Sequence, residues 1–161
     1  ALMNKFKWGN FDKQKLFVDH SYAPSVQGLR MMMMRLASLY EARGDKEKAA
    51  AVALRYFESF PNMNFQYDLR VMPFIQSLVS AGKLDDAKKH LRILATETAD
   101  MMNFYNSLSA EELKSSFQQE KAYANSSVRE IILRSSEFQD PEFEKEMKEL
   151  LSKYDLAPVN N

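Results

Sequence analysis

The chain has 161 residues, of which 45% are hydrophobic and 12% aromatic, so it is long enough to form a packed domain. Lysine and arginine number 22, as do aspartate and glutamate, and this balance argues against a nucleic-acid-binding protein, which usually carries a basic excess. Cysteine is absent, which excludes disulfides, thiolate metal ligands and cysteine nucleophiles. Because glycine and proline are few and helix formers are plentiful, the composition predicts an all-α fold.

Residues 1–24 contain aromatic side chains without helical periodicity, and they predict an irregular, extended N-terminal arm. A short strand-like piece over residues 15–18 is compatible with this pattern. Because a free tail rarely carries four aromatic residues, we expect the arm to pack on the helices. Trp8 is the expected anchor, although it could instead contact a missing part of the protein. The chain starts without an initiator methionine, so we expect it to be a segment of a longer parent chain.

Residues 25–61 predict the first helical hairpin. Gly44 ends its first helix, because glycine accepts the left-handed conformation that closes a helix C-terminus. Asp45 is suited to cap the second helix, and Pro61 disfavours helical geometry at the residue before it. The apolar stripe of the first helix recurs at spacings of +4, +3 and +4, and it consists of Leu29, Met33, Leu36 and Tyr40.

A shift of 38 residues brings Gly44 onto Gly82 and predicts a second hairpin over residues 67–107. Pro73 allows two arrangements of its first helix. The helix could begin at this proline, which leaves fewer than three turns before the glycine, or begin near Tyr67 and bend. We favour the kinked helix.

The third predicted hairpin covers residues 110–155 and is less regular. Ser109 and Glu112 have the spacing of a capping box and predict the start of a long helix. A turn follows, after which Asp140 caps the last helix. Residues 156–161 should fray.

Seven residues of the first hairpin are spaced as in a known helical repeat, and they are Leu36, Ala37, Tyr40, Gly44, Asp45, Ala49 and Pro61. This hairpin resembles the tetratricopeptide repeat. The second hairpin keeps Gly82 but has Ala99 where the closing proline would stand, and the third has no glycine at its turn. The period of 38 exceeds the usual ~34 residues. The resemblance implies a tetratricopeptide-like α-α superhelix of about three hairpins that stack on one another.

Three further segments lie at residues 3–10 (Met-Asn-Lys-Phe-Lys-Trp-Gly-Asn), 44–46 (Gly-Asp-Lys) and 102–105 (Met-Asn-Phe-Tyr). With them, residues 3–155 resemble the C-terminal soluble region of a family of bacterial multi-spanning membrane proteins. The N-terminal part of that family is similar to protein O-mannosyltransferases, and the helical tail has no established role. The resemblance implies a soluble, periplasmic segment of an inner-membrane protein whose catalytic residues lie upstream. None of those residues maps onto this chain.

The four consecutive methionines at 31–34 form the candidate binding site. At tetratricopeptide spacing, Met31, Met34 and Ser38 would face the concave groove; the alternative is that the methionines fill the core or contact the arm. An apolar groove would suit a hydrophobic or amphipathic peptide. The corresponding positions of the second hairpin are Leu69, Met72, Gln76 and Val79.

No catalytic constellation is recognisable. His20 and His90 are far apart in the sequence, without partners at the spacing that a zinc site requires. We therefore expect no enzyme activity, no cofactor and no metal in this segment. The predicted function is a non-catalytic helical-repeat domain for protein–protein or interdomain contact. Its partner would be a protein, a peptide or the membrane-embedded part of its own parent chain. The alternative function is an accessory lobe that presents acceptor polypeptides to a membrane-bound glycosyltransferase-like protein.

Overall fold

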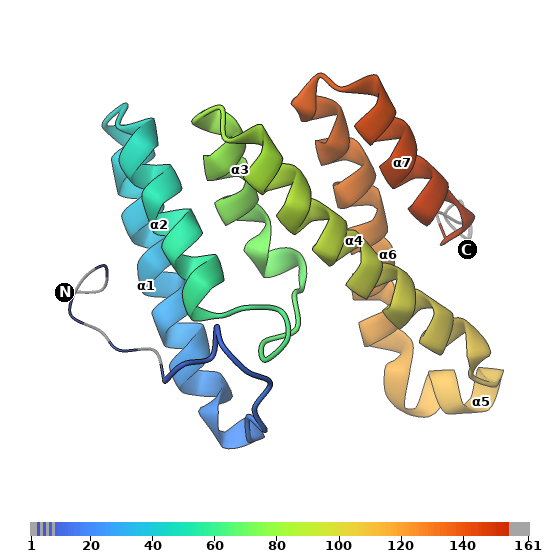
Figure 1. Ribbon diagram of the computed structural model, residues 1–161. Helices are drawn as coiled ribbons and strands as arrows, with labels where there is room; N and C mark the ends of the chain where they lie inside the picture. The colour runs from blue at the N-terminus through green and yellow to red at the C-terminus, as the bar shows by residue number, and fades with distance from the viewer. Residues whose placement is uncertain (1–2, 4, 6, 8, 155–161) are drawn as a thin grey trace. The chain divides into compact units, whose positions relative to one another are not determined.

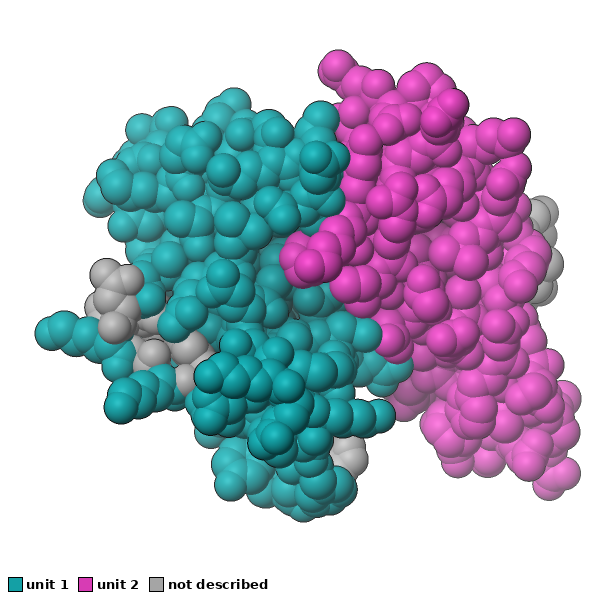
Figure 2. Space-filling model, viewed as in Figure 1, with its two compact units in different colours: residues 1–87 teal, residues 88–161 magenta. Residues whose placement is uncertain are grey.

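The computed structural model describes residues 3, 5, 7 and 9–154 (Figure 1). These residues form helices and turns without a strand, so the all-α prediction is confirmed. The segment at 15–18, predicted as strand-like, is irregular. The chain divides into two compact units, residues 1–87 and residues 88–161 (Figure 2).

The helices of the first unit are α1 (Ala23–Ala42), α2 (Lys46–Ser59) and α3 (Met72–Ser80), with 3₁₀ turns at His20–Tyr22 and Leu69–Val71. Helix α4 (Leu84–Ser107) begins at the end of the first unit and continues into the second. The second unit also contains α5 (Ala110–Glu112), a π-helical turn (Leu113–Phe117), α6 (Gln118–Ser135) and α7 (Pro141–Leu151), with 3₁₀ turns at Ser136–Phe138 and Ser152–Tyr154.

The two predicted glycine turns are confirmed and have the same geometry. Gly44 has a φ of +76° and Gly82 a φ of +73°, both in the left-handed region. The Gly44 N–H donates to the carbonyl of Glu41, and the Asp45 N–H donates to the carbonyl of Tyr40, both at 2.9 Å. An equivalent pair of hydrogen bonds surrounds Gly82. These bonds form a Schellman motif, which satisfies carbonyl groups at the end of each helix.

The limits of the first hairpin agree with the prediction to within two residues. Helix α1 begins at Ala23 with Pro24 in its first turn, where a missing N–H has no cost, so the arm is slightly shorter than predicted. The Asp45 carboxylate accepts the Lys48 N–H at 3.1 Å and caps α2 as expected. Helix α2 ends one residue before Phe60, which precedes Pro61.

The prediction of a kinked helix from Tyr67 is wrong. The chain makes a 3₁₀ turn after Asp68, whose carboxylate accepts the Arg70 N–H, and α3 then begins at Met72. Pro73 therefore lies in the first turn of α3, where proline needs no hydrogen-bond acceptor. The short helix, rejected in the prediction, is the one that forms.

Aromatic stacking joins α2 and α3 in the core of the first unit. Tyr56 and Phe74 stack with ring centroids 4.1 Å apart and an interplanar angle of 9°, and both side chains are buried. From α1, Met33 and Ala37 are buried in the same unit. Figure 1 shows α1 and α2 side by side, with α3 next to α2.

In the second unit, charged pairs join α4 to α7. Lys88 pairs with Asp140 at 2.6 Å, and Arg92 makes two hydrogen bonds to Glu146. Asp140 also caps α7, as predicted, by accepting N–H groups of the first turn. The inward residues of α7 are buried, and they are Phe143, Met147 and Leu151.

The predicted capping box of Ser109 and Glu112 is confirmed, but the helix that follows is not uniform. A π-helical turn separates α5 from α6. This turn places Phe117 against Phe104 in an edge-to-face contact with centroids 5.7 Å apart. The ring of Tyr105 lies beside that of Phe104, at 5.4 Å, and its centroid is 6.1 Å from that of Phe117. The irregular turn therefore has a packing partner at the end of α4.

Candidate functional site

The methionine run is split between the core and the surface. Met33 is fully buried, whereas Met31 is 46% and Met32 48% exposed, and Met34 is half-buried. This alternation follows from the ~100° that each residue turns around a helix. Core filling is therefore correct for Met33, and the adjacent methionines remain available on the surface.

The three residues predicted to face a groove share one face of α1, and we call Met31, Met34 and Ser38 the groove row. Met31 and Ser38 are exposed. Met34 and Ser38 also line a shallow, open and mainly apolar hollow together with Arg35 and Leu39. No carboxylate pairs with Arg35 among the residues that the structure describes.

The predicted second half of the groove does not form a matching open surface. Met72 is only 4% exposed, which corrects its assignment to the groove. The physical reason is the start of α3 at this residue, directly after the buried Val71 of the 3₁₀ turn. Leu69, Gln76 and Val79 are half-buried. Helix α1 nevertheless exposes three large apolar side chains, which are Met31, Met32 and Leu39.

A second apolar row lies beside the groove row, and we call Met32, Leu36 and Leu39 the edge row. Their spacing of i, i+4 and i+7 places them on one stripe of α1. Leu39 is 55% exposed and Leu36 is half-buried. The sequence pattern puts Leu36 on the same apolar stripe as the buried Met33, because helical periodicity alone does not distinguish a buried face from an uncovered one.

A buried polar cluster, which the sequence analysis missed, lies between α1, α2 and the turn before α3. Arg30 is buried, lies 3.4 Å from the carboxylate of Asp68 and has its guanidinium over the Tyr56 ring. Burial opposes ionisation of Asp68, but hydrogen bonds from Arg70 and the charge of Arg30 hold its pKa below the usual value. Burial raises the pKa of Tyr56. The sequence signal for this cluster is Arg30 itself, a charged residue among the apolar residues of α1.

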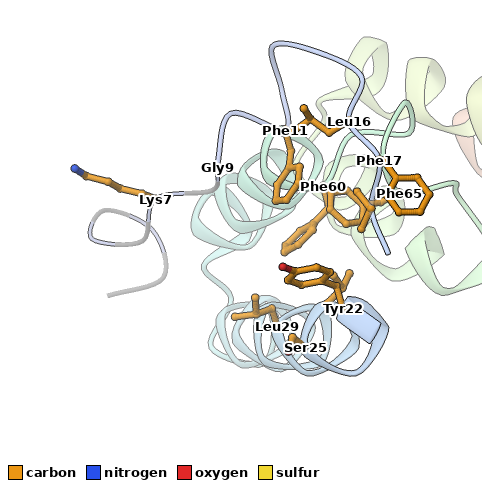
Figure 3. Close-up of a pocket in the computed structure, with 12 residues that line it drawn as sticks. Lys7, Gly9, Phe11, Leu16, Phe17, Tyr22, Ser25, Leu29, Phe60 and Phe65 are labelled. Atoms are coloured by element: carbon orange, nitrogen blue, oxygen red, sulfur yellow. The ribbon is translucent and has the colours of Figure 1, made fainter. Parts of the chain in front are cut away.

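The N-terminal arm, α1 and the end of α2 line an apolar cavity of about 500 Å³ that is open to solvent (Figure 3). Phe11 and Phe60 contribute rings to its wall, and Leu29 contributes from α1. The Lys7 side chain extends away from the cavity in Figure 3. Since small-molecule sites usually combine apolar walls with a few convergent polar groups, this cavity is better explained by packing of the arm.

The arm is attached to the first unit by Asn64, whose amide nitrogen donates to the carbonyls of Phe11 and Gln14. Phe11 also packs edge-to-face on Phe65, with centroids 4.9 Å apart. Phe17 is an exception to the expected packing, since it is 91% exposed. Trp8, the predicted anchor, lies outside the described residues.

Of the two histidines, His90 has a side chain that the structure describes, and it is buried. Burial, with a smaller effect from Lys89, lowers the pKa of His90 to about 4, so this imidazole is neutral at physiological pH. The side chain of His20 is outside the described part of the chain. Among the described residues, no group of three His, Asp or Glu side chains has the arrangement of a metal site. None of the helices described is long and apolar enough to cross a membrane.

Comparisons with protein-family models, with curated proteins and with solved structures find no match to this chain. The resemblance of the first hairpin to the tetratricopeptide repeat therefore stays a prediction. The same holds for the resemblance of the chain to the tail of the mannosyltransferase-like membrane proteins.

Proposed function

We propose that this chain is a protein-interaction module that binds an apolar or amphipathic polypeptide segment on the exposed face of α1. The observation that carries the proposal is the exposure of Met31 on a helix whose opposite face buries Met33 and Ala37. Methionine side chains adapt to partners of different shape, and they are common on surfaces that bind apolar segments. Contiguous exposed apolar side chains are typical of interaction sites.

The shape of the surface favours a polypeptide over a small molecule. The hollow at Met34 and Ser38 is shallow, and all four of its lining residues come from one helix. Small-molecule sites usually enclose most of their ligand, whereas an extended or helical peptide can lie along a helix and contact successive turns. The partner can be a separate protein or another part of a longer parent chain.

Site-specific photo-crosslinking in native cells tests this function. A photoreactive phenylalanine analogue at Met31 should form crosslinks to a polypeptide, whereas the same analogue at Ala51, an exposed position of α2, should not. Mass spectrometry should locate the crosslink in an apolar or amphipathic segment. The Met31→Ser, Met34→Ser variant, probed from Ser38, should lose this crosslink while it keeps its melting temperature. Equal crosslinking from both positions, or none from Met31, would contradict the proposal.

A further inference from the structure

The second hairpin shows what covers two of the three edge-row positions, since Met32 corresponds to the exposed Arg70. The shift of 38 residues that relates Gly44 to Gly82 also relates Leu36 to Phe74 and Leu39 to Ser77. In α3, these two positions form the contact with the preceding hairpin: Phe74 stacks on Tyr56 of α2, and the Ser77 hydroxyl donates to Glu41 of α1 at 2.6 Å.

Among the residues that the structure describes, no helix covers the equivalent positions of α1. Phe74 and Ser77 are buried, whereas Leu39 is exposed and Leu36 half-buried. The described part of the arm lies against the beginning of this side of α1, where Leu29 lines the arm cavity. Met32 follows Leu29 by one turn and is exposed. The edge row is thus the uncovered continuation of a surface that the chain covers elsewhere with a helix.

Charge specifies what kind of helix fits this surface. Arg35 lies beside the edge row, and Arg43, the C-cap of α1, follows Leu39 by four residues; both are exposed. Neither has a carboxylate partner in the part of the chain that the structure describes. The positions of α3 that correspond to them by the same shift are uncharged, Pro73 and Ala81. An external partner can therefore use two cations that the internal contact does not need.

We infer that the edge row binds an acidic amphipathic helix of a partner protein, stacked on α1 from the side opposite α3. Its apolar stripe would contact Met32, Leu36 and Leu39, and its glutamates or aspartates would pair with Arg35 and Arg43. A second copy of the chain fits less well, because a symmetric contact between two α1 helices would bring the cations of both copies into one interface. This inference rests on the proposed function and names the partner class for one row of the α1 surface.

Two synthetic amphipathic helices test the inference with the complete chain. Both are ~18 residues long, about five helical turns, and carry the same leucine stripe, but one is flanked by glutamates and the other by lysines. Fluorescence anisotropy should show the acidic peptide binding at least ~10-fold more tightly than the basic peptide. The difference should shrink at high salt, which screens exposed charges.

Matched variants assign the binding to the edge row. The double variant Met32→Ser, Leu39→Ser should bind the acidic peptide ~10-fold or more weakly. The groove-row variant Met31→Ser, Met34→Ser should change the affinity for this peptide less than about twofold. Arg35→Glu leaves the apolar row unchanged and should reduce or reverse the charge preference. Thermal unfolding should show that each variant remains folded.

Several results would overturn the inference. It fails if both peptides bind equally or neither binds. It also fails if binding depends on the groove row alone, an outcome that leaves the proposed function intact. If the chain forms a dimer that Leu39→Ser dissociates, a second copy occupies the edge row and the inference is wrong.

Discussion

Asn64 holds the N-terminal arm by accepting the backbone N–H of Leu16 at 2.7 Å through its side-chain oxygen. Its amide nitrogen donates to the backbone carbonyls of Phe11 and Gln14, so one side chain satisfies three backbone groups of an irregular segment. An irregular backbone has no internal hydrogen-bond ladder, and its polar groups need such partners when they are removed from water. The arm is therefore attached through specific contacts in addition to its aromatic packing.

Replacement of Asn64 by alanine should loosen the arm without unfolding the helices. We expect a loss of about 1–2 kcal/mol in the free energy of unfolding, because part-buried backbone groups lose their partners. Hydrogen exchange at the Leu16 amide should accelerate, whereas exchange in α2 should change little. Asn106→Ala, at an exposed position of α4, is the control and should leave both measurements unchanged. Unaltered exchange at Leu16 in the Asn64 variant would refute this role.

The left-handed glycine turns can be tested with a matched glycine elsewhere in the chain. Gly44→Ala and Gly82→Ala should each destabilise by about 1 kcal/mol, because a side chain disfavours a positive φ even where space is available. Gly28 lies within α1, has no left-handed φ and has no neighbour within 4 Å of an added Cβ. Gly28→Ala should therefore stabilise by about 0.5–1 kcal/mol. Chemical denaturation measures all three, and the same sign for all of them would contradict the turn assignment.

The sequence predicts the helices well where the signal is local. Gly44 and Asp45 each determine backbone geometry through their own chemistry, and both behave as predicted. Pro73 was ambiguous because proline permits a helix start as well as a kink. The choice depends on Asp68, which caps the preceding 3₁₀ turn and directs the chain into a new start.

The contacts that hold the arm and the turn before α3 in place are not local, and this is why the sequence did not reveal them. The pair of Arg30 and Asp68 is separated by 38 residues, and the contact of Asn64 with Leu16 by 48. Periodicity placed Leu36 on the inward stripe, but whether a helix covers that side depends on the arm and on neighbouring hairpins. The exposed edge row could be recognised only after the arm and α3 were placed.

Because the charge of Arg30 is buried, replacement of its partner Asp68 should strongly reduce the stability of the fold. Asp68→Asn removes the carboxylate 3.4 Å from the guanidinium of Arg30, whose side chain is 9% exposed, and we expect a loss of about 2 kcal/mol in unfolding free energy. Asp100→Asn, at an exposed site of α4, should change stability by less than about 0.5 kcal/mol. Adding Arg30→Met to Asp68→Asn should restore part of the loss, because the charge left without its partner is then removed. If the double variant is no more stable than Asp68→Asn, the pair has little importance for the fold.

Because His90 is neutral in the folded chain, the free energy of unfolding should vary with pH in the mildly acidic range. Burial lowers the pKa of His90 from 6.5 to about 4, so between these values the unfolded chain binds a proton that the folded chain does not. Stability must therefore fall as the pH decreases from about 6.5 to about 4, and we expect a loss of about 2 kcal/mol from this residue. Urea unfolding at several pH values measures the slope.

The His90→Gln variant separates this effect from the titration of carboxylates. It removes the imidazole proton site while it keeps a polar side chain of similar size, so the decline between pH 6.5 and pH 4 should become shallower than in the unmodified chain. The variant should lose some stability at pH 7 because Gln does not reproduce the packing of the imidazole of His90, a residue that is 8% exposed. Direct NMR titration should place the His90 transition well below that of an exposed histidine. An imidazole that titrates near 6.5, or a variant with an identical pH slope, would show that His90 does not control this transition.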